Sequence, residues 1–236
     1  MEYSKVEREQ FLMNYASVRE NIERAAIEAG RKPEEIELCA VTKTFGREAY
    51  EFARDAGLKY IGENRVQEAE NKYRTGHQGV ALRLIGHLQT NKAAKTVGLF
   101  DTVDSLDSLR LGALLNDLAQ KSNLVLPVLA EINVGDDPNK NGIRLEDTEN
   151  FCENLLTMTS LRLDGFMTIL PLGCSESKKM EYFTKISEKS LDISNKLFHN
   201  KDMLLSMGMS GDYIEAIKCG STMIRIGTAL FGRRQR

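Results

Sequence analysis

The stretch ELCAVTK, residues 37–43, is a short apolar run of β-prone residues that ends in a lysine. Runs of the same kind follow along the chain at residues 59–62, 82–86, 100–103, 128–134, 163–169, 203–207 and 223–227. Helical stretches lie between them, with apolar stripes such as Leu106, Leu109, Ala113 and Leu118, or Phe183, Ile186, Ile193 and Leu197. Strands that alternate with helices form a parallel sheet covered by helices. Eight such strands favour an α/β fold with a closed (β/α)8 TIM barrel, and a doubly wound open sheet is the alternative.

The residues before these strands predict an additional N-terminal helix. One helical face carries the apolar residues Val18, Ile22, Ala25, Ala26 and Ala29. The pattern stops at Gly30, and Pro33 follows, as is typical of a helix end. No Pro-, Gly- or Ser-rich linker divides the chain, so we expect residues 1–236 to form a single domain.

The composition of the chain excludes some classes of binding partner. Lys and Arg number 32 against 34 Asp and Glu, which argues against nucleic acid or an anionic membrane as a partner. The N-terminus lacks a signal peptide, and no apolar run approaches the ~20 residues that cross a bilayer. The cysteines are scattered, without a CxxC pair or a histidine at metal-ligand spacing. We therefore expect a soluble, cytoplasmic protein with reduced thiols and no metal site. We also expect a monomer.

Lys43 is the first candidate for a functional side chain. Barrel enzymes work at the C-terminal ends of their strands, and Lys43 ends the apolar strand that begins at Glu37. Desolvation there would lower the pKa of an ammonium group, and the neutral amine can attack an aldehyde. A lysine that snorkels to solvent is the alternative, and one strand alone favours it. His87 also lies at a strand end, but it has no carboxylate or cysteine neighbour in the sequence.

Two glycine-containing turns predict a phosphate site. SMGMSGD at residues 206–212 joins a strand to a helix, and RIGT at residues 225–228 follows the next strand. Backbone N–H groups at a helix start bind phosphate, and barrels often build such sites after strands seven and eight. A plain loop capped by Ser210 or Asp212 explains one turn alone, whereas two adjacent turns favour phosphate. Arg225 needs an acceptor, because an unpaired guanidinium inside a barrel is costly.

Five segments resemble the pyridoxal 5′-phosphate (PLP) homeostasis protein family, the YggS/PROSC type. They are AVTK (40–43), IGENRVQE (61–68), IGHLQTNK (85–92), SMGMS (206–210) and IRIGTALFG (224–232). The resemblance runs in order from about residue 37 to residue 232. It implies the barrel of the alanine racemase N-terminal domain and PLP as cofactor, without an established turnover.

The resemblance also implies roles for single residues, none of them catalytic and none a metal ligand. By position, Lys43 matches the Schiff-base lysine, Asn64 a residue beside the cofactor, Ser210, Gly227 and Thr228 the phosphate binders, Arg225 the pyridine-nitrogen partner, Met207 a residue against the site, and Lys140 a lysine near the pocket mouth. The chain departs from the family pattern at Arg83, where many members have histidine, and at Phe45–Gly46, where Lys-Pro is common.

These features favour a PLP carrier over an enzyme. Arginine stays protonated, so Arg225 should keep the pyridine nitrogen unprotonated and weaken the ring as an electron sink. Alanine racemases add a C-terminal β-domain that supplies a tyrosine base, and we expect no such domain here because the chain ends at Arg236. We expect a protein of intracellular PLP homeostasis that buffers PLP and passes it to apo PLP-dependent enzymes. The alternatives are a small PLP-dependent amino-acid racemase and a Schiff-base aldolase.

Overall fold

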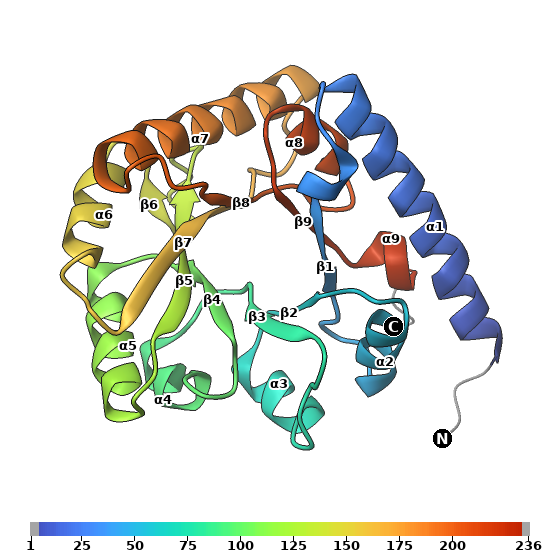
Figure 1. Ribbon diagram of the computed structural model, residues 1–236, viewed down its shortest axis with the longest axis horizontal. Helices are drawn as coiled ribbons and strands as arrows, with labels where there is room; N and C mark the ends of the chain where they lie inside the picture. The colour runs from blue at the N-terminus through green and yellow to red at the C-terminus, as the bar shows by residue number, and fades with distance from the viewer. Residues whose placement is uncertain (1–4, 233–236) are drawn as a thin grey trace.

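The computed structural model describes residues 5–232, and eight of its strands close into a parallel barrel (Figure 1). The eight are β1 (Glu37–Val41), β2 (Tyr60–Glu63), β3 (Ala81–Leu84), β4 (Thr102–Leu106), β5 (Leu126–Asn133), β7 (Leu161–Thr168), β8 (Leu204–Ser206) and β9 (Met223–Ile226). They follow one another in the order β4-β3-β2-β1-β9-β8-β7-β5, and pairing of β4 with β5 closes the ring. The predicted barrel is confirmed, and each of the eight predicted runs overlaps one strand.

A ninth strand, β6 (Ile143–Arg144), was not predicted. It pairs in parallel with the end of β5, at Ile132 and Asn133, beyond the point where β4 ends. A two-residue strand is too short to show the alternation on which strand prediction depends.

Helices surround the ring on the outside (Figure 1). They are α1 (Lys5–Glu28), α2 (Arg47–Asp55), α3 (Val66–Lys72), α4 (Ala93–Thr96), α5 (Leu109–Lys121), α6 (Thr148–Leu155), α7 (Glu176–Leu197), α8 (Tyr213–Lys218) and α9 (Thr228–Phe231), with 3-10 turns η1 (Pro33–Glu35) and η2 (Thr90–Lys92). On α7 the predicted Phe183, Ile186 and Ile193 are buried.

The predicted stripe on α5 was right only in part. Leu109 and Leu118 pack against the core, whereas Leu106 belongs to β4 and Ala113 is exposed. The buried face consists instead of Leu111, Leu115 and Ala119, which are spaced four residues apart. The helix begins after the N-cap Ser108, whose hydroxyl accepts a bond from the N–H of Leu111, so Leu106 lies before its first turn.

The expected N-terminal helix is α1, and it covers the side of the ring where β1 pairs with β9. Its residues Val18, Ile22, Ala25 and Ala26 are buried, and the helix packs against α8 and α9 (Figure 1). The chain then turns at Gly30, whose φ of 69° lies in the left-handed region that glycine tolerates. The prediction of one domain over residues 1–236 extends to residues 1–4 and 233–236, which lie outside the described residues.

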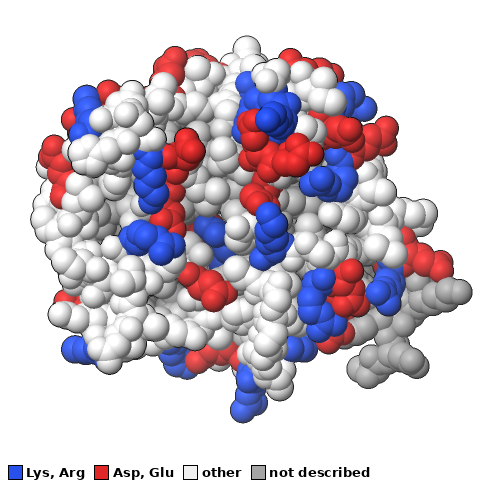
Figure 2. Space-filling view, in the orientation of Figure 1, with Lys and Arg blue, Asp and Glu red and all other residues white. Residues whose placement is uncertain are grey.

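Within residues 5–232, no helix has the length and apolar character needed to span a membrane. In the same part of the chain, no three His, Cys, Asp or Glu side chains gather where they could hold a metal ion. Figure 2 shows acidic and basic side chains mixed over the face in view, without a large area of one sign.

Candidate functional site

A cavity of about 240 Å³ opens at the C-terminal ends of the barrel strands. It is lined by Val41, Lys43, Phe45, Asn64, Ile85, Ile169, Met209, Ser210, Arg225, Gly227 and Thr228. Six of the seven predicted cofactor-binding residues are among them, although they come from four separate regions of the chain. The fold brings them together because the loops that follow β1, β2, β8 and β9 emerge at the same end of the ring.

Met207 is the predicted residue that does not line the cavity. Its side chain is fully buried in the core, and its N–H donates to the carbonyl of Met223 at 3.0 Å. Met209 lines the cavity instead. Between them, Gly208 adopts a φ of 97°, and this left-handed turn redirects the chain from the core to the cavity.

Arg225 is held rigidly in the wall of the cavity. The side chain comes from β9 and is 3% exposed. Its Nη1 donates to the hydroxyl of Ser206 at 2.8 Å and also to the Ser206 carbonyl, and Nη2 donates to the carbonyl of Thr168 at 2.8 Å. These are the acceptors that a buried guanidinium requires. Burial lowers the pKa of Arg225, and the negative charge of Asp104 opposes that effect.

The two turns predicted to bind phosphate are joined to each other. The hydroxyl of Ser210, after β8, accepts a hydrogen bond from the N–H of Ala229, after β9, at 3.3 Å. Asp212 precedes α8, but its carboxylate accepts from the N–H of Met209 at 2.6 Å rather than capping that helix. Gly227 lies against β1, where an added Cβ would come within 3.3 Å of the Val41 carbonyl oxygen.

Lys43 lies in a strained turn between β1 and α2. The next residue, Thr44, has a φ of 68°, which is unfavourable for a β-branched side chain. The N–H of Phe45 donates back to the carbonyl of Thr42 at 3.1 Å, so the turn is closed on itself. Lys43 is therefore the second residue of a tight turn that begins directly after β1.

Asn64 is fixed against the neighbouring strand end. A Cβ added at Gly86 would come within 2.5 Å of the Asn64 carbonyl oxygen. Only glycine allows the two backbones to approach so closely. The backbone contact holds Asn64 at the edge of the cavity.

Lys140 lies beside the cavity without lining it. The residue belongs to the loop after β5, and its Nζ donates to the carbonyls of Leu170 at 2.5 Å and Ile169 at 3.3 Å. Ile169 is itself a lining residue. Asn133 braces the same loop through its Nδ2, which donates to the carbonyl of Asp137 at 2.8 Å. Lys140 therefore joins two loops at the mouth of the barrel.

A titratable cluster near the mouth was missed by the sequence reasoning. His87 Nδ1 lies 2.9 Å from Asp107 Oδ2, so His87 does have a carboxylate neighbour, twenty residues further along the chain. Burial raises the pKa of Glu131 on β5 to about 7, and the charge of Asp107 adds to the shift. The signal was available, since His87 and Asp107 each follow one of two consecutive strands.

A second cavity, of about 420 Å³, lies between α1, the turn after Lys43 and α9. Its walls include the rings of Phe11, Phe45, Phe52 and Phe231. Phe45 also lines the smaller cavity, so its ring stands between the two. The smaller cavity is the candidate site, because it holds the amine, the guanidinium and the hydroxyls that the chemistry needs.

The barrel and its cavity are similar to those of a known class of protein, the N-terminal barrel domain of alanine racemase. The family model for the N-terminal domain of alanine racemase matches residues 13–235. The chain is also 38% identical over 225 residues to the pyridoxal phosphate homeostasis protein of Escherichia coli K12, a match that covers 94% of this chain and 95% of that protein. The chain belongs to the pyridoxal phosphate homeostasis protein family.

Solved structures agree with this family. PipY of Synechococcus elongatus with PLP bound is 31% identical, with a TM-score of 0.79 over 90% of this chain and 100% of that one. PipY without PLP has a TM-score of 0.80 at 32% identity, over 89% of this chain and 99% of that one. An alanine racemase of Clostridium difficile, 18% identical, has a TM-score of 0.75 over 97% of this chain and 57% of that enzyme, and it shows the fold alone.

Proposed function

We propose that this protein binds PLP in the smaller cavity and buffers it for delivery to apo PLP-dependent enzymes, without strong catalytic turnover. The observation that carries the proposal is the meeting of Lys43, Arg225, Ser210 and Thr228 in one cavity. The family supports it, since relatives are named pyridoxal phosphate homeostasis proteins and PipY has been solved with PLP bound.

The cavity fits PLP in size and chemistry. Its volume of about 240 Å³ lies just below the ~300–1,000 Å³ of pockets that bind drug-sized ligands, so it suits one smaller molecule. Lys43 would hold the aldehyde carbon in a Schiff base, and Val41 and Ile85 would supply apolar walls. Bound there, PLP supplies an electrophilic aldehyde and an aromatic ring that can accept electrons.

The phosphate would be held by neutral donors. Ser210 and Thr228 offer hydroxyls. The backbone bonds of α9 begin at the N–H of Leu230, which donates to the carbonyl of Gly227 at 2.9 Å, so the N–H of Thr228 precedes them. The bond between Ser210 and Ala229 already fixes the two turns relative to each other. Asn64 would lie beside the ring, and Arg225 would face the pyridine nitrogen.

Two features support a carrier over a catalyst. The guanidinium of Arg225 is fixed by acceptors from two neighbouring strands and stays protonated, so it would leave the ring a weak electron sink. Among the described residues that line the cavity, none is Tyr, His, Cys, Asp or Glu. Racemisation requires proton removal on one face and delivery on the other, and Lys43 can serve only one face.

The proposal takes the protein as a cytoplasmic monomer with one domain over residues 1–236. The four free cysteines, Cys39, Cys152, Cys174 and Cys219, support a reducing compartment.

One experiment separates carrier from catalyst. The PLP-loaded protein is incubated with single-enantiomer amino acids in deuterated water, and in parallel with an apo PLP-dependent enzyme. We expect neither inversion nor fast α-deuteration, whereas the apo-enzyme regains activity. Racemisation at roughly 1 per second or faster would replace the carrier by a small PLP-dependent racemase. A protein that takes up no PLP at all would contradict both.

A further inference from the structure

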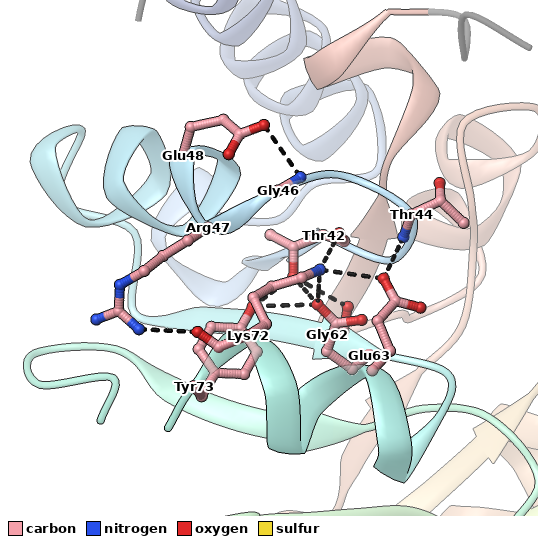
Figure 3. A network of polar contacts seen from close by, with 10 residues as sticks. Thr42, Thr44, Gly46, Arg47, Glu48, Gly62, Glu63, Lys72 and Tyr73 are labelled. Atoms are coloured by element: carbon pink, nitrogen blue, oxygen red, sulfur yellow. Dashed lines mark hydrogen bonds and ion pairs between the residues drawn. The ribbon is translucent and has the colours of Figure 1, made fainter. Parts of the chain in front are cut away.

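The residues next to Lys43 are held by a polar network whose members do not line the smaller cavity. It includes Glu63 at the end of β2, Lys72 on α3 and the adjacent Tyr73, which Figure 3 labels, and also Glu68 on α3. We propose that Glu68 and Lys72 are positioning residues, which fix the turn after β1 so that Lys43 reaches the aldehyde carbon of PLP. The inference rests on the proposed function of Lys43.

The network holds Thr42, on the N-terminal side of Lys43. The hydroxyl of Thr42 donates to Glu63 Oε1 at 2.7 Å. Lys72 Nζ donates to the backbone carbonyl of Thr42 at 2.8 Å and to Glu63 Oε1 at 2.6 Å. Figure 3 shows the lysine ammonium between these partners. Both the backbone and the side chain of Thr42 are therefore fixed.

The same network holds Thr44, on the C-terminal side. The N–H of Thr44 donates to Glu68 Oε1, and the same oxygen accepts from Lys72 Nζ at 3.1 Å. Thr44 has the unfavourable φ of 68°. A backbone in such a conformation persists only when its surroundings determine it. Lys43 thus lies between two residues that one lysine and its carboxylate partners hold in place.

The cost of the network argues for a role beyond stability. Glu63 is fully buried and Lys72 is 6% exposed. Within the described part of the chain, Glu63 Oε2 has no hydrogen-bond partner, and burial raises the pKa of this carboxyl group. Replacing such buried ion pairs by apolar residues is often neutral or stabilising. An apolar contact between β2 and α3 would not hold the N–H of Thr44.

The first test removes one acceptor from the less buried side of the network. Glu68 is 26% exposed, so Glu68→Ala should fold. We expect the Thr44 amide to exchange with deuterium faster, and borohydride-trapped label to form on Lys43 at least about tenfold more slowly. Glu68→Gln keeps an acceptor oxygen and should recover most of both losses. Lys72→Arg, which keeps the charge but moves the donors, should slow labelling as well.

A matched control comes from the surface of α7. Glu181 accepts from two lysines, Lys178 and Lys185, as an exposed counterpart of Glu68. Glu181→Ala should change neither the exchange of Thr44 nor the labelling of Lys43. Urea unfolding of each variant reports any general loss of stability.

A second substitution tests whether Glu68 acts by positioning Lys43 or only by stabilising the fold in general. Glycine adopts a positive φ without strain, so Thr44→Gly removes the need to hold this residue. The double variant Glu68→Ala/Thr44→Gly should regain labelling of Lys43. Wild-type labelling and exchange in Glu68→Ala, or a loss that Thr44→Gly does not repair, would overturn the inference. If the wild-type protein binds no PLP, the proposed function fails. Exchange of the Thr44 amide in Glu68→Ala would still test whether Glu68 holds the turn.

Discussion

Arg83 and Asp104 form an ion pair with two hydrogen bonds inside the barrel. Nε lies 2.8 Å from Oδ2, and Nη2 lies 2.9 Å from Oδ1. The side chains, from the neighbouring strands β3 and β4, are 7% and 0% exposed. The charge of Asp104 also acts on Arg225, so the pair contributes to the electrostatics beneath the cavity.

Breaking this pair should be costly, because it leaves a charge buried alone. We expect Arg83→Met to lower the free energy of unfolding by about 3–5 kcal/mol. Arg162 and Asp164 offer a control with the same two-bond geometry, but Arg162 is 55% exposed. Arg162→Met should cost less than about 1 kcal/mol in the same urea titration. If both variants lost the same free energy of unfolding, burial would not explain the cost of breaking the Arg83–Asp104 pair.

Lys43 should be the lysine that reacts with PLP. Lys43→Ala is expected to abolish the pyridoxyl label trapped by borohydride, as read by peptide mass spectrometry. Lys140→Ala is the control, because Lys140 lies at the mouth of the barrel but bonds to the carbonyls of Ile169 and Leu170. That variant should keep the label on Lys43. A label that moves to another lysine in Lys43→Ala would refute the assignment.

The phosphate should dominate discrimination between PLP and pyridoxal. Wild-type protein is expected to bind pyridoxal much more weakly, measured by absorbance titration. Ser210→Ala removes one hydroxyl and should weaken PLP binding about tenfold, with little change for pyridoxal. Ser177→Ala, on the surface of α7, should change neither affinity. Equal affinities of wild type for the two compounds would remove the phosphate site.

Glu131 should make stability depend on pH. The folded state holds its proton up to pH about 7, because burial raises the pKa from the ordinary 4.5, whereas the unfolded chain releases it near 4.5. Folding therefore becomes less favourable as the pH rises from 4.5 to 7. Glu131→Gln has no proton to release, so it should gain up to about 3 kcal/mol above pH 7 and nothing below pH 4.5.

Charged side chains near Glu131 also shift its pKa. Asp107 raises the pKa of Glu131 further, whereas Arg225, His87 and Lys140 oppose the shift. Urea unfolding of the protein without PLP at pH 4.5 and pH 8 measures the difference. A gain of the same size at both values would assign it to packing rather than to the proton.

The barrel and most of the cavity could be predicted from the sequence, because both depend on local patterns. Apolar runs mark strands, and a residue that follows a parallel strand lies at one known end of the ring. Lys43 was placed in this way, whereas Asn64 and the role of Arg225 came from the resemblance to the family. Met207 and Met209 were not separated, since the left-handed turn at Gly208 decides which of them lines the cavity.

Contacts between distant residues could not be predicted. The bonds of Arg83 to Asp104 and of Lys72 to Thr42 join residues 21 and 30 positions apart, and no periodicity reports such pairs. The buried face of α5 was predicted only in part. The apolar pattern does not show that the helix begins after Ser108, so Leu106 of β4 was assigned to it.

The packing of α1 on α9 sets the order in which the chain can be assembled during synthesis. The ring closes where β1 meets β9, and α1 covers that junction (Figure 1). A nascent chain that still lacks residues 223–231 has neither the partner strand of β1 nor the helix on which α1 packs. Until then the unpaired edges of β1 and β8 are open to other chains. Closure of the barrel therefore has to wait until residues 223–231 have been synthesised, and before that a chaperone would have two open strand edges to protect.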